Sequence, residues 1–211
     1  MNPRPFHPER TTDTDPRRGF FDHHARHWDR DVAATETMLT RLRSLAEVVG
    51  VRSGMDVLEV GCGTGQVTPW LAATVQPGRV MAIDFSPAML AEARAKGVPA
   101  ELRCLDVCAE PPPSRAFDLV LCFQCFPHFR DRATALRHLG AGLKTGGRLV
   151  ILHLCGREQV NGFHRHVGGV VGEDMLPENG EWPELLTPAG LVPVTLKDEP
   201  DLFLLEAALK A

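Results

Sequence analysis

The sequence predicts a single α/β domain in which helices cover both faces of a mostly parallel sheet, and three observations support this prediction. The chain has 211 residues, 44% of them hydrophobic, which is enough to bury one sizeable core. Short apolar runs alternate with stretches of helical periodicity, as they do where each parallel strand is followed by a crossover helix. The first apolar run also ends in closely spaced glycines that lead into a helical stretch, a pattern typical of a strand–turn–helix unit.

The amino-terminal quarter of the chain precedes the alternating region and is expected to be largely helical. Residues 1–16 are polar and rich in proline, so we expect them to be disordered or loosely attached. Two helices are predicted over residues 17–50, because apolar residues recur at helical spacing in two groups: Phe21, Ala25, Trp28 and Val32, then Met38, Leu42, Leu45 and Val49. The second helix should end at Gly50. Residues 17–50 are therefore expected to form a helical cap within a single domain over residues 17–211.

Five apolar runs in the alternating region are predicted to be strands. They span residues 55–60, 79–84, 100–105, 117–123 and 147–154. The helices predicted between them span residues 66–75, 86–97 and 130–147, and Ser86-Pro87 is a favourable helix start. The link over 106–116 contains three consecutive prolines and is predicted to be a loop. After a helix near 182–190, two further strands separated by a Lys-Asp-Glu-Pro turn predict a terminal hairpin with one antiparallel strand.

Composition and charge argue against several classes of function. The formal net charge is −4 and there is no long basic run, so binding to a nucleic-acid backbone has little support. The amino terminus lacks the apolar core of a signal peptide, and no apolar run approaches the roughly 18 residues that span a bilayer. The six cysteines lie mostly beside apolar segments and are expected to be reduced. We therefore expect a cytoplasmic monomer or homodimer without a membrane anchor, acting on a small molecule.

The stretch VLEVGCGTGQ, residues 57–66, is the most informative part of the sequence. Glycines at a strand–helix turn let the backbone approach a ligand closely. Glu59 lies two residues before the first glycine, and Asp84 ends the next predicted strand, where an acid can bind both hydroxyls of a ribose. The glycine spacing is G-x-G-x-G, and Gln66 stands where a nicotinamide-binding G-x-G-x-x-G loop has its third glycine. The spacing therefore argues against a dehydrogenase.

Five segments, taken together, identify a family. They read VLEVGCGTG, IDFSPAML, CLDV, FDLVLCFQCFPHF and LKTGGRLVILH, and they cover roughly residues 50–154. In these motifs and their order the chain resembles the class I S-adenosylmethionine-dependent methyltransferases. The segment FFDHHARHWD is also similar to the FDxxAxxWD lead-in of ubiquinone- and menaquinone-type methyltransferases. The resemblance implies a Rossmann-like sheet of seven strands in the order 3-2-1-4-5-7-6, with the last strand antiparallel.

The resemblance also implies which residues bind S-adenosylmethionine and its product S-adenosylhomocysteine. Those expected at the methionine part are Glu59, Gly61, Cys62, Gly63 and Gly65; those at the ribose and adenine are Asp84, Phe85, Met89, Asp106 and Val107; and those beside the sulfonium are Phe123 and Gln124. Asp84 would bind the ribose hydroxyls, and Asp106 would accept a hydrogen bond from the adenine amino group. Ordinary core packing is the alternative explanation for Phe85 and Met89.

The acceptor is expected beyond the fourth and fifth predicted strands, because ligands bind at the carboxyl ends of strands in open α/β sheets. His153 ends the fifth strand, and residues 155–181 are predicted to be a substrate-side insertion. A helix over 157–167 would carry a polar stripe of Arg157, Asn161 and His164 beside an apolar stripe of Val160, Phe163 and Val167. We expect the polar stripe to face the cleft and to suit an anion or a proton to be removed. The alternative is a solvent-facing polar helix whose apolar side seals the core.

Further candidates for the acceptor site come from two other segments. His128 follows the fourth strand and is a candidate base or substrate contact, or else a loop histidine against aromatic rings. Phe20, Phe21 and Trp28 are candidates to roof the substrate pocket, with plain packing as the alternative, and Cys125 is expected to face the pocket. No metal site is expected, because Cys122 and Cys125 lack a convincing second cysteine pair.

The function predicted from the sequence is transfer of a methyl group from S-adenosylmethionine to a small-molecule acceptor, with the nucleophilic atom undetermined. The amino-terminal segment favours one alternative, a quinone-type C-methyltransferase. A second alternative is a nonenzymatic S-adenosylmethionine-binding protein, because the glycine loop with Glu59 and Asp84 indicates cofactor binding but not catalysis. A third is a thiol or arsenite methyltransferase that uses Cys125.

Overall fold

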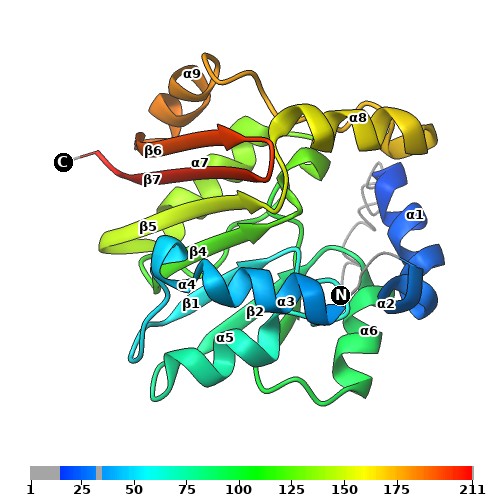
Figure 1. Cartoon of the computed structure of the whole chain (residues 1–211). Coiled ribbons are helices and arrows are strands. Elements are labelled where there is room, and N and C mark those ends of the chain that lie inside the picture. Colours follow the sequence, from blue (N-terminus) through cyan, green and yellow to red (C-terminus); the bar gives the residue numbers. More distant parts are fainter. Residues whose placement is uncertain (1–14, 32–34, 211) are drawn as a thin grey trace, which may run out of the picture.

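The computed structural model describes residues 15–31 and 35–210 of the chain, and within them seven strands form one sheet (Figure 1). The strands are β1 (Val57–Val60), β2 (Val80–Asp84), β3 (Glu101–Cys104), β4 (Phe117–Phe123), β5 (Leu143–His153), β6 (Leu191–Glu199) and β7 (Leu202–Leu209). Their order is β3-β2-β1-β4-β5-β7-β6. Strand β7 runs antiparallel to β5 and β6, whereas the pairs among β1 to β5 are parallel. The expected strand order and the terminal hairpin are confirmed.

Helices and short 3-10 turns surround the sheet. The α-helices are α1 (Pro16–His24), α2 (Trp28–Asp31), α3 (Thr35–Ser44), α4 (Ala46–Val49), α5 (Thr68–Val75), α6 (Pro87–Ala95), α7 (Arg132–Gly142), α8 (Arg157–Val167) and α9 (Trp182–Leu186). The 3-10 turns are η1 (Ala25–His27), η2 (Phe126–His128), η3 (Gly169–Val171) and η4 (Thr187–Ala189). In the part of the chain that the structure describes, no helix is both long and apolar enough to cross a bilayer.

The sheet is the centre of two hydrophobic clusters, one on each face. Strands β1 and β2 are buried along their whole length, as expected for parallel strands covered on both sides. Leu136 of α7 and Trp182 of α9 join the cluster on one face, and Leu42 of α3 and Leu71 of α5 join the cluster on the other. The edge strands β3 and β6 are largely exposed. The central strands thus form a rigid platform whose carboxyl ends carry the loops described below.

Helices α1 and α8 lie past the carboxyl ends of the central strands (Figure 1). Helix α6 begins as predicted, because the Ser86 hydroxyl accepts a hydrogen bond from the backbone N–H of Met89 and Pro87 follows it. Helix α1 lies against α6 and η3. Two segments distant in sequence, at the amino terminus and after β5, therefore meet at the same edge of the sheet.

Three elements differ from the sequence predictions. The first predicted helix is broken into α1, η1 and α2, and its last expected apolar residue, Val32, lies outside the described residues. The helix near 182–190 is α-helical only to Leu186, because Pro188 lacks the backbone N–H that a longer α-helix needs. Strand β5 begins four residues earlier than predicted, at Leu143 instead of Gly147, and its pairing with β4 contains a register shift. Residues 1–14, expected to be loose, also lie outside the described residues, and Asp15 caps α1.

Candidate active site

The turn after β1 holds three glycines in left-handed conformations. Gly61, Gly63 and Gly65 have φ angles of 67°, 55° and 76°. A Cβ atom on Gly61 would lie 2.5 Å from the Cβ atom of Cys125, so glycine is required there by close approach as well as by conformation. A Cβ atom on Gly63 would meet only the indole nitrogen of Trp28, at 3.9 Å. The backbone at Gly63 therefore stays open to a ligand.

Two buried carboxyl groups flank this loop. Glu59 in β1 is 3% exposed and Asp84 at the end of β2 is 7% exposed. Asp84 accepts hydrogen bonds from the backbone N–H groups of Gly63 and Ser86, both at 2.8 Å, and so ties the two strand ends together. Burial raises the pKa of Asp84 to about 6 despite these two donors. Burial also raises the pKa of Glu59 to about 8, helped by the neighbouring charge of Asp84.

Glu59 is a buried acid with an unused oxygen. No described residue donates a hydrogen bond to its Oε2 atom, and the residue lines the cavity at the end of β1. A buried polar atom left without a partner costs free energy, which a bound donor would recover. The α-ammonium group of S-adenosylmethionine is such a donor, and it would also pair with the carboxylate charge. The donor set at this loop therefore fits the methionine end of that cofactor.

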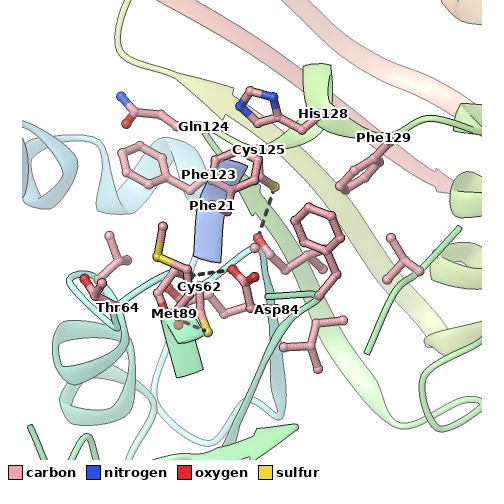
Figure 2. A pocket seen from close by; sticks show the side chains of 18 of the residues that line it. Phe21, Cys62, Thr64, Asp84, Met89, Phe123, Gln124, Cys125, His128 and Phe129 are labelled. Carbon is pink, nitrogen blue, oxygen red and sulfur yellow. Dashed lines mark hydrogen bonds between the residues drawn. The ribbon is translucent and has the colours of Figure 1, made fainter. Parts of the chain in front are cut away.

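A cavity of about 350 Å³ lies at the carboxyl ends of the central strands. Most residues predicted from the sequence line it: Trp28, Glu59, Gly61, Cys62, Gly63, Asp84, Phe85, Met89, Asp106, Val107, Phe123, Gln124, Cys125, His128, His153 and His164. Figure 2 shows Phe123, Gln124, Cys125 and His128 on one side of the cavity, opposite Cys62, Asp84 and Met89. Four predicted residues do not line it, namely Phe20, Gly65, Arg157 and Asn161.

The end of the cavity beside β2 and β3 is mainly apolar and aromatic. Met89 is buried in a small cluster with Phe21, and the rings of Phe21 and Phe85 meet edge to face at 5.7 Å. Asp106 accepts a hydrogen bond from the backbone N–H of Cys108 at 2.8 Å, and its other oxygen lies 3.7 Å from Arg130. These surroundings are compatible with a purine ring held between apolar side chains and one carboxylate.

Gln124 directly follows β4 and lines the cavity. Its φ angle of 53° is unusual for a residue other than glycine. Its backbone N–H donates to the carbonyl oxygen of Leu152 in β5 at 2.9 Å, which holds this conformation in place. Such uncommon backbone conformations cluster at functional sites. The chain therefore leaves β4 in a fixed direction that sends residues 124–128 along the cavity wall.

Residues 16–31, which we call the amino-terminal strap, form another wall of the cavity. Phe21 and Trp28 line it, with their rings 5.6 Å apart. Asp22 accepts hydrogen bonds from the Ser86 hydroxyl at 2.6 Å and from the backbone N–H of Ala88 at 3.2 Å. This carboxylate therefore fixes the strap to the first turn of α6.

A second carboxylate of the strap, Asp29, reaches the glycine loop. It accepts hydrogen bonds from the hydroxyl of Thr64 and from the amide of Gln66, the latter at 2.8 Å, and it pairs with Lys96. Neither Asp22 nor Asp29 was among the site residues predicted from the sequence. The available signal was that they are the two acids of FFDHHARHWD, at the spacing of two helical turns.

Three histidines gather at the other end of the cavity: His128 in η2, His153 at the end of β5 and His164 in α8. The rings of His128 and His164 are 5.0 Å apart. Burial lowers the pKa of His153 to about 3 and that of His164 to about 4, and the charge of His128 adds to both shifts. His153 and His164 are therefore neutral at physiological pH. The structure thus places the three predicted histidines along the same cavity.

His128 differs from the other two histidines in having a carboxylate partner. Its Nδ1 atom lies 2.8 Å from Oδ2 of Asp174, which is 1% exposed. Asp174 also accepts hydrogen bonds from Nε and Nη2 of Arg17, at 2.8 Å and 2.6 Å to its Oδ1 atom. Although burial disfavours its charge, His128 and Arg17 hold the pKa of Asp174 below its usual range. Asp174 and Arg17 were not predicted as site residues, because nothing in their local sequence indicates a contact between segments 157 residues apart.

The predicted polar stripe on α8 does not act as one surface. Arg157 faces away from the cavity and pairs with Glu178 at 2.8 Å and Asp198 at 3.5 Å. Asn161 is buried and exchanges hydrogen bonds with both backbone groups of Leu176, so it holds the following segment in place. Only His164 of the stripe lines the cavity. From the apolar stripe, Val160 and Phe163 line it as well, as does Cys155, which the sequence analysis did not include.

The cysteines at the cavity have the properties of buried thiols. Burial raises the pKa of Cys125 well above its usual value, and its sulfur lies 3.1 Å from the carbonyl oxygen of Val60. Burial likewise raises the pKa of Cys62. These surroundings oppose the thiolate that a metalloid ligand or nucleophile requires. Over residues 15–31 and 35–210, no cluster of three or more His, Cys, Asp or Glu side chains is arranged to hold a metal ion.

Comparison with known proteins relates this site to a family. Residues 57–147 match the family described as a methyltransferase domain. The chain is 30% identical over 131 residues to malonyl-[acyl-carrier protein] O-methyltransferase of Acetivibrio thermocellus, covering 61% of this chain and 46% of that protein. It is also 30% identical over 146 residues to the ubiquinone/menaquinone biosynthesis C-methyltransferase of Shewanella sp. strain ANA-3, covering 66% of this chain and 57% of that protein. The chain thus spans about half the length of the relatives it matches.

A solved structure extends the likeness to nearly the whole fold. A SAM-dependent methyltransferase from Aquifex aeolicus superposes with a TM-score of 0.62 at 21% identity, covering 90% of this chain and 97% of that one. The sheet order, the antiparallel β7 and the glycine loop between β1 and α5 are the features that the sequence resemblance implied. Residues 57–147 are thus similar to methyltransferase domains, and the chain has the fold of a solved SAM-dependent methyltransferase.

Proposed function

We propose that this protein binds S-adenosylmethionine and transfers its methyl group to a small, uncharged acceptor. The observation that carries the proposal is one continuous cavity with two chemically different ends. One end has the glycine loop with Glu59 and Asp84, and the other has three histidines without a lysine or arginine among the described lining residues. We further propose that it does so in the cytoplasm, as a monomer or homodimer.

The cofactor end of the cavity supports binding of all three parts of S-adenosylmethionine. Glu59 and the backbone at Gly63 suit the methionine part, Asp84 suits the ribose, and Phe85, Met89 and Asp106 suit the adenine. The cofactor supplies a sulfonium-activated methyl group. The protein therefore has mainly to align an acceptor atom with that group and to exclude water.

The acceptor end of the cavity supports an uncharged acceptor in place of the anion considered from the sequence. Arg157, which was expected to bind an anion, is engaged by two carboxylates outside the cavity. His153 and His164 are neutral, and their surroundings include Val160, Phe163 and Cys155. Neutral imidazoles offer hydrogen bonds without a net charge, which suits a hydroxyl, amide or carbonyl group on a largely apolar molecule.

A quinone-type C-methyltransferase is the second candidate. Two observations favour it, namely the aromatic wall formed by Phe21 and Trp28 and the similarity to the ubiquinone/menaquinone biosynthesis C-methyltransferase. A preference for prenylated aromatic acceptors over simple phenols would distinguish it from an O-methyltransferase. A nonenzymatic S-adenosylmethionine-binding protein remains the alternative from another class, because one fold serves many functions.

An acceptor screen that follows release of S-adenosylhomocysteine tests the proposal. The panel should contain phenols, alcohols, quinones, amines, thiols and arsenite, with the wild-type protein, an Asp84→Ala variant and a Glu47→Gln control. Glu47 is exposed on α4, away from the cavity. We expect turnover with an uncharged oxygen or carbon acceptor by the wild type and the control, and none by Asp84→Ala. Tight cofactor binding by calorimetry with no release across the panel would contradict methyl transfer and favour the nonenzymatic alternative.

A further inference from the structure

Three segments far apart in the sequence meet at one buried carboxylate. Asp174 follows η3, His128 lies in η2 after β4, and Arg17 lies in the first turn of α1. The Asp174 side chain is 1% exposed, and its two oxygens contact Nδ1 of His128 and the Nε and Nη2 atoms of Arg17. His128 also lines the cavity, so this buried cluster of charged groups lies directly behind one of the cavity's walls.

The contact with Asp174 determines how His128 presents its ring. The Asp174 carboxylate can only accept a hydrogen bond, so Nδ1 of His128 must carry the proton and donate it. The neutral ring then keeps a lone pair on Nε2. The ring is fixed further by edge contacts with Phe21 and His164, with centroids 5.0 Å away in both cases. His128 also lines the cavity. Its Nε2 atom is thus available as a base toward a bound molecule.

The two neighbouring histidines lack these properties. Nε2 of His153 and Nδ1 of His164 are buried without a hydrogen-bond partner among the described residues. Burial keeps the pKa of both rings well below the usual range, so neither accepts a proton readily. Among the described histidines at the cavity, His128 is the one whose ring nitrogen directly contacts a carboxylate.

We propose that Asp174 and Arg17 are positioning residues that hold His128 as the general base for a hydroxyl-bearing acceptor. This inference rests on the proposed methyl transfer and narrows the acceptor atom to oxygen. The acceptor O–H bond breaks as its proton moves to Nε2 of His128. The oxygen lone pair forms the new bond to the methyl carbon, and the electrons of the breaking carbon–sulfur bond stay on sulfur. The imidazolium then returns its proton to solvent.

Arg17 makes this base depend on the amino-terminal strap. Arg17 lies in α1, and its guanidinium group donates hydrogen bonds to Asp174. It also donates a hydrogen bond to Asp15, the residue that caps this helix. The strap is fixed independently to the cofactor loops by Asp22 and Asp29. Docking of one segment therefore completes the cofactor wall and orders the carboxylate behind the base.

The two positioning residues have opposite electrostatic effects on His128, which provides a sharp test. The Asp174 carboxylate stabilises the imidazolium, whereas the Arg17 guanidinium opposes it through the shared carboxylate. The other ionisable groups that face His128 are His153, His164 and Asp84, and they stay the same in both variants. Opposite shifts would show that both charges act on the His128 ring, and loss of turnover in the second experiment would show that this ring acts as the base.

The first experiment uses long-range proton–nitrogen NMR on the labelled full-length chain with S-adenosylhomocysteine bound. Wild-type His128 should show a protonated Nδ1 and a bare Nε2. In Asp174→Asn its titration curve should move to lower pH by about one unit, and in Arg17→Gln to higher pH by about half a unit. Arg43→Gln, which removes an exposed ion pair with Glu36, is the matched control and should change nothing. A protonated Nε2 in the wild type, or shifts in one common direction, would overturn the proposal.

The second experiment measures turnover with the hydroxyl acceptor found in the screen. His128→Gln should lower kcat about 100-fold or more, as expected for loss of a general base. Asp174→Asn should lower kcat at least about tenfold with little change in KM. Calorimetric affinity for S-adenosylhomocysteine should stay within about twofold of wild type in every variant, because the cofactor contacts are intact. Unchanged kcat in His128→Gln would overturn the proposal while leaving methyl transfer itself standing.

Discussion

Glu59 is the residue whose environment most directly indicates a missing partner. Its carboxyl group is buried and protonated near neutral pH in the free protein, since its pKa is raised to about 8, and one oxygen has no donor among the described residues. We expect Glu59→Gln to weaken S-adenosylmethionine binding about tenfold or more, because a charged hydrogen bond to the ammonium group is replaced by a neutral one. Calorimetry would measure this. The exposed Glu47→Gln variant should bind like wild type, and equal affinity of all three proteins would exclude Glu59 from the methionine site.

The positions of the residues near the glycine loop could be predicted from the sequence, but the arrangement of those beyond β5 could not. Glu59 and Asp84 lie within or directly after β1 and β2, so a short local pattern fixes their position at the strand ends. Arg157 and Asn161 share a helical face with His164, yet their partners come from residues 176–198. Helical spacing gives the angle between side chains but not the direction in which the whole helix faces. The contact of Asp174 with Arg17 depends on tertiary packing in the same way.

At the scale of elements, the glycine loop and the segment after β4 are fitted to each other. Gly61→Ala places a Cβ atom 2.5 Å from Cys125 Cβ, in addition to the strain of a φ angle of 67°. Gly97→Ala has the same kind of strain, with φ of 65°, but its Cβ atom would meet nothing within 4 Å. We expect Gly97→Ala to lower the free energy of unfolding by about 1 kcal/mol. Gly61→Ala should cost at least about 2 kcal/mol more, because the buried segment must shift.

Urea denaturation of the two alanine variants would test this comparison. If both variants lost equal stability, the close approach between the loop and Cys125 would not be a feature of the folded protein. Retained cofactor affinity in Gly97→Ala, together with loss in Gly61→Ala, would show in addition that the loop's shape is needed for binding.

The amino-terminal strap is expected to support the cofactor loop through Asp29. This carboxylate contacts Thr64, Gln66 and Lys96, and although burial opposes it, the contact with Lys96 lowers its pKa. Asp29→Asn should weaken S-adenosylmethionine binding roughly tenfold, since charged hydrogen bonds to the loop are lost. Arg26→Gln, an exposed change on the same strap, is the control. The affinity for S-adenosylmethionine would be measured by fluorescence or calorimetric titration. Equal affinities for Asp29→Asn and wild type would show that Asp29 of the strap does not support cofactor binding.

Local sequence predicted the presence of most elements, but tertiary contacts determined several of their limits. Helix α6 begins where Ser86 and Pro87 favour a start. The first predicted helix is instead broken at Ala25–His27, within a strap held at Asp22 by α6 and at Asp29 by the glycine loop. Contacts at both ends override a continuous helical pattern.

At the scale of the whole molecule, the buried ionisable groups predict how stability depends on pH. The pKa of Glu59 is raised to about 8 in the folded, ligand-free protein, so the folded state binds more protons than the unfolded state from about pH 4.5 to 8. Stability must therefore fall as pH rises through this window. The pKa of His153 is lowered to about 3, so its contribution is lost as pH falls below about 6.5.

Thermal or urea unfolding at pH 5 and pH 8 would check these signs. Relative to Glu59→Gln, the wild type should lose on the order of 2–4 kcal/mol of stability between pH 5 and pH 8. Relative to His153→Leu, it should lose stability between pH 7 and pH 4. Saturating S-adenosylmethionine should reduce the loss at pH 8, because the bound ammonium group favours ionised Glu59. If the difference in unfolding free energy between wild type and Glu59→Gln did not vary with pH, the raised pKa of a buried Glu59 carboxyl group would be contradicted.

The fold as a whole could be predicted from the sequence because its signals repeat. Each of β1, β2 and β4 is an apolar run that contains a single acid, and buried parallel strands need apolar side chains on both faces. The terminal hairpin follows from two strands with a turn too short for a crossover helix. The cavity is less predictable, since its walls come from the strap, η2 and α8, which meet only in three dimensions.

Transfer of a labelled methyl group is the most direct test of the central claim. The wild-type protein would be incubated with S-adenosylmethionine carrying a trideuterated methyl group and the acceptor panel, and the products would be analysed by mass spectrometry beside the Asp84→Ala variant. We predict that the label appears on an uncharged acceptor with the wild type and not with the variant. Saturating cofactor binding with no labelled acceptor anywhere in the panel would contradict the assignment of this cavity as a methyl-transfer site.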